Sequence, residues 1–249
     1  MRTLIAIPVF NEAKTVRRVL ESVLRHAGNV LVVDDGSTDA TPAIVSELPV
    51  DVIRHCVNRG YGQSLIDAFH FAHNEGYDWV VTMDADEQHE PDKIPNFIAA
   101  ADRGVADILS GSRYKVPGPR VGTVPPERRR VNSEITRELN DRLGLDLTDA
   151  FCGFKAHRVG AMQRLSLTET GYAFPMQLWV QAAAAGLRIA EIPVDLIYND
   201  PNRSFGAHLD DAGVRLAHYR EVMHREIARH RDQLSPAASW GLVPQYTGR

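Results

Sequence analysis

The stretch Trp79–His89, which reads WVVTMDADEQH, joins a short apolar run to two closely spaced carboxylates. The run Trp79–Met83 has the length and the residue types of a buried strand. Asp84 and Asp86 follow it directly, with the small Ala85 between them, so both carboxylates are expected just past the strand end. The stretch therefore predicts a buried strand that brings two acidic side chains to one edge of a sheet.

Other apolar runs of strand length occur through the first half of the chain, and segments with helical spacing lie between them. Further strands are expected at Leu4–Val9, Val30–Val33, Val50–Arg54 and from Asp107 to about Gly111. Because strands alternate with helices, we predict an α/β fold with a mostly parallel, doubly wound central sheet flanked by helices. Ligands of such sheets bind at the carboxyl ends of the strands.

Polar residues follow four of the expected strands at their carboxyl ends. The clusters are Asn11-Glu12, Asp34-Asp35, Asp84–Asp86 and Ser112-Arg113. Because parallel strands end at the same edge of a sheet, we expect the clusters to form one site. Each cluster taken singly has a simpler interpretation. Asp34 and Asp35 could cap a helix or form an Asx turn, and an Asp-Ala-Asp turn could merely be solvated.

The second half of the chain is less regular. Its expected elements are a proline-rich loop at Lys115–Pro126, helices at Val131–Leu143 and Phe174–Gly186, a strand at Ile189–Val194, an amphipathic helix between Leu209 and Ile227, and a tail after about Gln233. With the first half, these elements fit a single domain of 249 residues.

The overall composition narrows the function classes. Asp and Glu number 32 against 28 Lys and Arg, a formal net charge of -4, so nucleic acid is not an expected partner. Cys56 and Cys152 form no CxxC pair, which argues against structural zinc and fits a reducing, cytoplasmic setting. No apolar stretch reaches membrane-spanning length, so contact with a membrane, such as its inner face, is expected to be peripheral.

The acidic pair after the fourth expected strand suits a metal ion. Carboxylate oxygens are the ligands that Mg²⁺ and Mn²⁺ prefer. A cation bound by Asp84 and Asp86 would hold the diphosphate of a nucleotide and neutralise the charge that develops on it as it leaves. Asp86 is therefore also a predicted catalytic residue.

Four segments occur together in an order and spacing that resemble one known family. They are Pro8–Glu12 (PVFNE), Val32–Asp39 (VVDDGSTD), Asn58–Gly62 (NRGYG) and Met83–His89 (MDADEQH). The combination resembles the family 2 glycosyltransferases of the GT-A fold, a Rossmann-like α/β fold. Within that family it is most similar to the branch of dolichol-phosphate mannose synthases and related polyprenyl-phosphate sugar transferases. The likeness extends from about Thr3 to Gly206.

The resemblance implies a domain plan and a donor site. The catalytic domain would span residues 1–231, with a nucleotide-binding half at 1–113, an acceptor-binding half at 114–206 and a C-terminal helix at 207–231, before a tail at 232–249. The implied nucleotide-sugar-binding residues are Pro8, Phe10, Glu12, Asp35, Asp84 and Arg203. The implied metal ligands are Asp84, Asp86 and Gln88.

A basic segment follows the fifth expected strand and suggests a site for the acceptor. Arg129 and Ser133 lie one helical turn apart, and a guanidinium beside a hydroxyl suits a phosphate monoester. The resemblance assigns these two residues and Arg113 to an acceptor phosphate, and it makes Arg113 a catalytic candidate. Arg128 or Arg130 could replace Arg129, because the register of the helix is open.

Asp149 is the last catalytic candidate. In relatives an acid in this region removes a proton from an acceptor hydroxyl. A phosphate acceptor needs no strong base, because its second pKa is about 6. Asp149 would then only position other groups, or cap a turn.

These observations predict an inverting glycosyltransferase that moves a hexose from a donor such as GDP-mannose or UDP-glucose. The predicted acceptor carries a phosphate, as polyprenyl phosphate does. Two alternatives are a glycosyltransferase for hydroxyl acceptors that uses Asp149 as base, and a non-catalytic module that binds sugar nucleotides. A nucleotidyltransferase is disfavoured because Phe10-Asn11-Glu12 stands where a glycine-rich loop would be expected. The sequence leaves the oligomeric state open, including a homo-oligomer.

Overall fold

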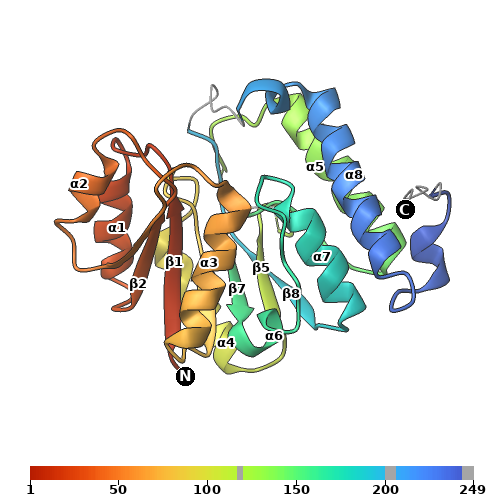
Figure 1. The fold of residues 1–249 in the computed structure, drawn as a ribbon, viewed down its shortest axis with the longest axis horizontal. Helices are drawn as coiled ribbons and strands as arrows, with labels where there is room; N and C mark the ends of the chain where they lie inside the picture. The colour runs from red at the N-terminus through yellow and green to blue at the C-terminus, as the bar shows by residue number, and fades with distance from the viewer. Residues whose placement is uncertain (117–119, 200–205, 243–249) are drawn as a thin grey trace.

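The computed structural model describes residues 1–116, 120–199 and 206–242 (Figure 1). Within these residues a seven-stranded sheet has the order β3-β2-β1-β4-β7-β5-β8. The strands are β1 Thr3–Val9, β2 Val30–Asp34, β3 Asp51–Arg54, β4 Trp79–Thr82, β5 Ile108–Ser112, β7 Lys155–Arg158 and β8 Ile189–Pro193. All neighbours pair in parallel except β7, which runs antiparallel to β4 and β5. The predicted mostly parallel α/β sheet is therefore confirmed.

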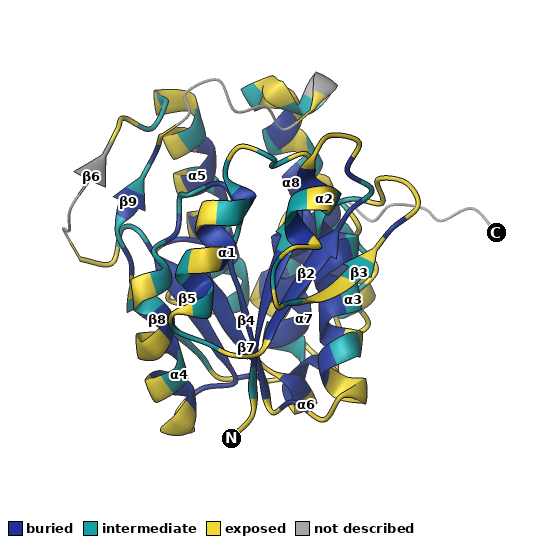
Figure 2. Ribbon diagram, turned by 90° about the vertical axis from the view of Figure 1, so that its left-hand side faces the viewer, coloured by how far each residue is buried: buried dark blue, intermediate teal, exposed yellow. Residues whose placement is uncertain are grey.

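Helices cover both faces of the sheet (Figures 1 and 2). One face packs against α1 Val16–Leu24, α2 Thr41–Val45 and α4 Ile94–Asp102. The other packs against α3 Tyr61–Asn74, α6 Val159–Met162 and α7 Phe174–Ala184, and α8 Ala212–Arg229 packs against α7 and α5 Pro126–Leu143. Alternate residues of β1 enter the two cores, because successive side chains of a strand point to opposite faces. This two-sided burial explains why β1 reads as a continuous apolar run.

Strand β7 was not expected from the sequence, yet it lies inside the sheet. Its residues read KAHR and lack an apolar pattern. Lys155, Ala156 and His157 are nonetheless buried, since β4 and β5 flank them on both sides. Helix α5 also begins earlier than expected, at Pro126 rather than Val131. The earlier start places the basic segment at residues 128–130 on the first turn of a helix.

Part of the expected tail is folded. The short 3₁₀ helix Pro236–Ser239 packs against α5 and α8, and Ala238 is fully buried. Arg142 of α5 donates hydrogen bonds to the backbone oxygens of Ala238 and Trp240, at 3.1 and 3.0 Å. The expectation of a tail after Gln233 is therefore corrected as far as Leu242, the last residue described.

The described chain also includes a small parallel pair of strands and two other 3₁₀ helices. The strands are β6 Arg120–Val121 and β9 Leu196–Ile197, and the 3₁₀ helices are Pro91–Lys93 and Ala207–Asp210. None of the helices in the described part combines the length and the apolar character that a membrane crossing requires.

Candidate functional site

The carboxyl ends of β1, β2, β4 and β5 open into one pocket of about 580 Å³. From the first half of the chain it is lined by Pro8, Phe10, Glu12, Asp35, Asp84, Asp86, Gln88 and Arg113, all of them predicted site residues. From the second half it is lined by Arg128, Asn132, Tyr198, Arg215 and Tyr219, among others. The strand-end clusters do converge on one site, as the geometry of a parallel sheet requires.

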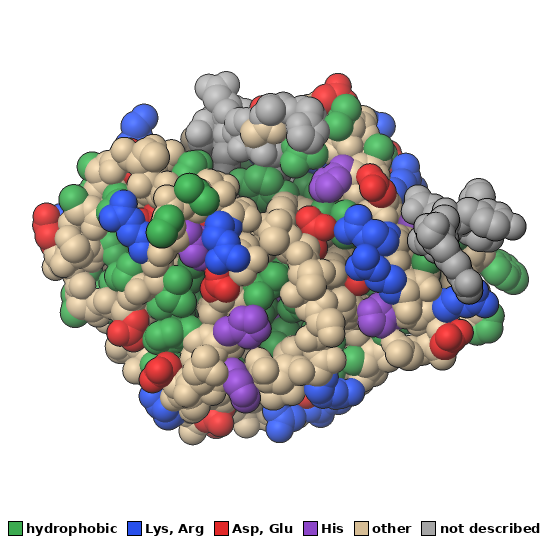
Figure 3. Space-filling view, in the orientation of Figure 1, with side chains coloured by type: hydrophobic (Ala, Val, Ile, Leu, Met, Phe, Trp, Pro, Cys, Tyr) green, Lys and Arg blue, Asp and Glu red, His purple; other side chains and the backbone are tan. Residues whose placement is uncertain are grey.

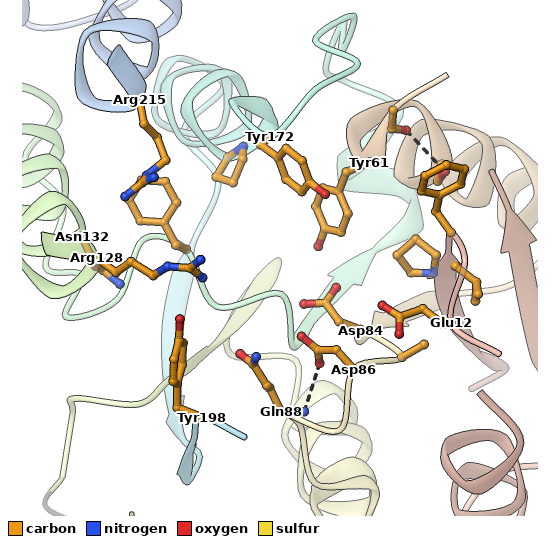
Figure 4. A pocket seen from close by; sticks show the side chains of 18 of the residues that line it. Glu12, Tyr61, Asp84, Asp86, Gln88, Arg128, Asn132, Tyr172, Tyr198 and Arg215 are labelled. Atoms are coloured by element: carbon orange, nitrogen blue, oxygen red, sulfur yellow. Dashed lines mark hydrogen bonds between the residues drawn. The ribbon is translucent and has the colours of Figure 1, made fainter. Parts of the chain in front are cut away.

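Two walls of opposite charge face each other across this pocket. Figure 4 shows Asp84, Asp86 and Gln88 on one side, and Arg128, Asn132 and Arg215 on the other. We call these the acidic wall and the basic wall. A ligand that carries both a metal-bound diphosphate and a second anionic group would be matched by this arrangement.

The acidic wall is a tight turn with an unusual backbone. Glu87 has a φ of 61°, in the left-handed region that non-glycine residues rarely adopt. Its carboxylate accepts two hydrogen bonds from Arg18 of α1, at 2.8 and 2.9 Å. The backbone N–H of Gln88 donates to Asp86 Oδ1 at 3.0 Å. These contacts hold the turn so that Asp84 and Asp86 both reach the pocket.

Asp84 is supported from behind by two neighbours. Its backbone N–H lies 3.0 Å from Nδ1 of His89 and points toward it. Gly153 lies against its carboxylate, and a Cβ at Gly153 would stand only 2.5 Å from Asp84 Oδ2. The missing side chain at Gly153 therefore leaves the space that Asp84 occupies.

The acidic wall fits a divalent cation that is shared with a substrate. Within the described residues, no group of three His, Cys, Asp or Glu side chains could hold a metal by itself. Two carboxylates that leave the remaining positions to phosphate oxygens and water are typical of Mg²⁺ bound with a nucleotide. Gln88 adds a buried amide whose nitrogen has no hydrogen-bond partner in the described chain. This donor suits an anionic oxygen of a bound diphosphate, and the carbonyl oxygen of the same amide is left to coordinate a cation.

Asp35 lies at the far end of the pocket, beyond β2. It is 3% exposed and accepts hydrogen bonds from the backbone N–H groups of Arg59 and Gly60, at 2.7 and 2.8 Å. Gly60 has a φ of 103°, and a Cβ there would stand 2.3 Å from the backbone oxygen of Thr170, so a side chain would not fit. Phe10 is 44% exposed and also lines this end. An exposed ring and a fixed carboxylate are suited to a nucleoside.

The basic wall contains residues that the sequence did not reveal. Arg215 is only 2% exposed, and its guanidinium donates to the backbone oxygens of Leu209 and Asp210, at 2.7 and 3.2 Å. The amphipathic pattern of this helix gave no sign that Arg215 would be buried. The guanidinium of Arg128 lies over the ring of Tyr198, 5.6 Å from its centre.

Tyr61, on the opposite side, points toward Asp84 (Figure 4) and was also missed. Burial and the charge of Asp84 raise the pKa of Tyr61, so its hydroxyl stays protonated. The NRGYG segment contains this tyrosine and was the available signal for it.

Arg113 and Asp149 form a buried ion pair. Arg113 Nε and Nη2 donate to the two carboxylate oxygens of Asp149, at 2.6 and 2.9 Å, and Asn132 Nδ2 donates to one of them at 2.9 Å. Burial alone would raise the pKa of Asp149, but these partners lower it to about 2. Asp149 is fully buried and does not line the pocket. Of the roles that the sequence left open for Asp149, this ion pair favours the positioning of Arg113 over the removal of a proton.

Arg129 and Ser133 lie on one face of α5, as predicted, but that face lines a second pocket of about 350 Å³. Arg137 lines it as well, and Tyr114 and Asn132 line both pockets. The three predicted acceptor residues are therefore divided, with Arg113 in the first pocket and Arg129 and Ser133 in the adjoining one. Arg203 lies outside the described residues.

Comparison with known proteins identifies the family. The sequence model of the protein family described as Glycosyl transferase family 2 matches residues 4–166 of this chain. The chain belongs to glycosyl transferase family 2. As a member of this family it is a glycosyltransferase, as the DxD and strand-end motifs predicted.

Two proteins similar to this family 2 enzyme are named for reactions of a polyprenyl lipid. An undecaprenyl-phosphate mannosyltransferase of Micrococcus luteus is 32% identical over 215 residues, covering 82% of this chain and 87% of the relative. A polyprenol monophosphomannose synthase of Mycolicibacterium smegmatis is 30% identical over 232 residues, covering 88% and 86%. The predicted resemblance to this branch is confirmed.

A solved structure supports the fold. Glucosyl-3-phosphoglycerate synthase from Mycobacterium tuberculosis superposes with a TM-score of 0.71 at 19% identity, covering 91% of this chain and 81% of that one. The same synthase has been crystallised with Mn²⁺, uridine diphosphate and its product, with a TM-score of 0.70 to this chain. At this identity the likeness establishes the shared fold, and the predicted GT-A fold is confirmed.

Proposed function

We propose that this family 2 glycosyltransferase transfers a hexose from a nucleoside diphosphate sugar to polyprenyl phosphate, and that this hexose is mannose. The observation that carries the proposal is the pair of oppositely charged walls in one pocket. The acidic wall suits a metal-bound donor diphosphate, and the basic wall suits a second anion. The names of the two bacterial relatives favour mannose and a polyprenyl phosphate.

Asp84, Asp86 and Gln88 would hold Mg²⁺ or Mn²⁺ on the donor diphosphate, and the cation would neutralise the charge of that leaving group. Asp35, Phe10, Pro8 and Glu12 would bind the nucleoside at the far end of the pocket. The acceptor oxygen would then attack the anomeric carbon from the side of the basic wall. Because attack and departure occur on opposite faces of the sugar, the configuration inverts.

The buried state of Asp149 agrees with a phosphate acceptor. A carboxylate with a pKa of about 2 that is paired with Arg113 is a poor proton acceptor. A phosphate monoester is already largely ionised near neutral pH, since its second pKa is about 6. Positioning by charged groups is then sufficient, and no base is required.

We place the acceptor phosphate at the boundary of the two pockets, which Tyr114 and Asn132 both line. Arg129 and Ser133 would bind it from the second pocket. Arg113, with Arg128 of the basic wall, would face it from the first. Guanidinium groups paired with a phosphate give charge-assisted hydrogen bonds, which are among the strongest in proteins.

The experiment incubates the purified chain with radiolabelled GDP-mannose and undecaprenyl phosphate in detergent with MnCl₂, and counts label that enters the organic phase. We expect labelled lipid from the native chain and none with excess EDTA. Asp86→Ala should lower the rate at least about 100-fold, because the leaving diphosphate loses its charge stabilisation.

Parallel reactions replace the donor with UDP-glucose, or the acceptor with a soluble phosphate monoester or a sugar alcohol. Undiminished transfer by Asp86→Ala would contradict the metal role. Product from the sugar alcohol but not from either phosphate would contradict the acceptor class. Circular dichroism of the variant checks that any loss of rate is not a loss of folding.

A further inference from the structure

A buried histidine connects two carboxylates just outside the pocket. His55 follows β3, and its Nδ1 lies 2.6 Å from Asp35 Oδ1. Its Nε2 lies 2.9 Å from Asp67 Oδ2, on α3. The side chains of His55 and Asp35 are each 5% exposed, and that of Asp67 is 22% exposed. Of the three, only Asp35 lines the pocket.

This geometry determines the protonation of the ring. An ionised carboxylate can only accept hydrogen bonds, so each ring nitrogen of His55 must donate one. A histidine that donates from both nitrogens is an imidazolium. The other charged group that faces the cluster is Arg59, whose guanidinium lies 3.7 Å from Asp67 and is 51% exposed. Both carboxylates thus lie beside the ring of His55, and one of them, that of Asp67, also lies beside the guanidinium of Arg59.

Asp35 depends on the Nδ1–H of His55 for its orientation. Its Oδ1 accepts from His55 and from the backbone N–H of Arg59, while its Oδ2 accepts from the backbone N–H of Gly60. On the far side, Asp67 is fixed by Gln63 Nε2, at 2.9 Å. Hydrogen bonds thus connect Gln63 and Asp67 of helix α3, through His55, to Asp35 at the pocket surface.

We propose that His55 is a positioning residue for the donor, an imidazolium that holds Asp35 in place against the nucleoside. The inference rests on the proposed donor role of Asp35. It does not involve the acidic wall or the acceptor, so variants of His55 should alter donor affinity while the turnover of bound donor is preserved.

The first test substitutes His55→Gln and measures the Kd of GDP and of UDP by calorimetry with MnCl₂. Glutamine can donate to one carboxylate only, and its carbonyl oxygen would face the other. We expect the Kd to rise about tenfold, which corresponds to about 1.4 kcal/mol. The kcat at saturating donor should stay close to native. His70→Gln, an exposed histidine on α3, is the matched control and should leave the Kd unchanged.

The second test substitutes Asp67→Asn. The new amide can donate to His55 Nε2, so the ring becomes neutral and still donates from Nδ1 to Asp35. Nucleotide affinity should therefore remain near native. The double variant His55→Gln/Asp67→Asn should recover most of the lost affinity. In it the glutamine carbonyl oxygen faces an amide donor instead of a carboxylate.

The protonation state is read directly from ¹⁵N resonances of labelled histidines, with His55 assigned by its absence in His55→Gln. We expect both ring nitrogens to be protonated in the native chain near neutral pH, and one in Asp67→Asn. A neutral ring in the native chain would overturn the inference, as would unchanged nucleotide affinity in a folded His55→Gln. A native chain that binds neither nucleotide would instead overturn the proposed function, and this inference with it.

Discussion

At the scale of single residues, the site depends on the lack of a side chain at one glycine as well as on its charged groups. Gly153 leaves the space that the Asp84 carboxylate fills, since a Cβ there would stand 2.5 Å from Asp84 Oδ2. We predict that Gly153→Ala displaces Asp84 and weakens metal use. The concentration of Mn²⁺ that gives half-maximal transfer should rise at least about tenfold, the effect of about 1.4 kcal/mol.

Gly160→Ala is the control for this substitution. Nothing lies within 4 Å of the position of its Cβ, and Gly160 is in helix α6, where alanine is the better helix former. Its metal dependence should equal that of the native chain. An identical Mn²⁺ titration for Gly153→Ala and the native chain would show that Asp84 does not hold the metal.

At the scale of elements, helices α5 and α8 are joined by charges rather than by apolar contacts alone. Figure 3 shows acidic, basic and histidine side chains interspersed over α8. Glu138 of α5 accepts hydrogen bonds from His224 and Arg220 of α8, both at 2.8 Å, and from Arg142 at 3.0 Å. These partners, His224 first, lower the pKa of Glu138 from 4.5 to about 2. Both helices contribute to the basic wall, so this junction also supports the pocket.

We predict that Glu138→Gln lowers the free energy of unfolding at neutral pH by about 1–2 kcal/mol, a value discounted for solvent screening. A carboxylate whose folded pKa is depressed stabilises the fold above its unfolded pKa, here 4.5, and this contribution disappears as pH falls toward about 2. Urea unfolding of variant and native chain should therefore converge at acid pH. Glu21→Gln, from an exposed pair, should change little at either pH. An equal loss at acid and neutral pH would refute the charge-based account.

At the scale of the whole molecule, we propose that the acceptor is bound mainly by residues of the second half, and the donor by residues of the first. The two pockets adjoin at Tyr114 and Asn132. We predict that Arg129→Ala raises the KM for polyprenyl phosphate about tenfold or more, because a charge-assisted hydrogen bond contributes about 1.5–3 kcal/mol. The KM for the sugar nucleotide should not change.

Arg130→Ala is the control, because Arg130 is exposed, pairs with Glu134 and lines neither pocket. Arg128→Ala reports on the first pocket in the same assay. If Arg129→Ala affects donor and acceptor equally, or matches Arg130→Ala, the acceptor phosphate does not bind at the boundary of the pockets.

The sequence by itself determined the strands β1 to β5 and the polar clusters that follow β1, β2, β4 and β5. These features are local: an apolar run and the residues next to it suffice to predict a strand and its carboxyl end. Parallel topology then brings the clusters together, so Asp35, Asp84 and Asp86 could be predicted as one site. The family and the GT-A fold followed from the same motifs.

Only the tertiary structure decided which partner each of the remaining groups met. β7 has no apolar pattern, and its burial comes from β4 and β5 on either side. On α5 a shift of one residue turns a side chain by about 100°, so local spacing could not tell Arg128 from Arg129. The burial of Arg215 and the ion pair of Asp149 could not be foreseen, because their partners are distant in the sequence and charge does not reveal burial. Long-range packing, which no local pattern encodes, separates a surface arginine from one that lines a pocket.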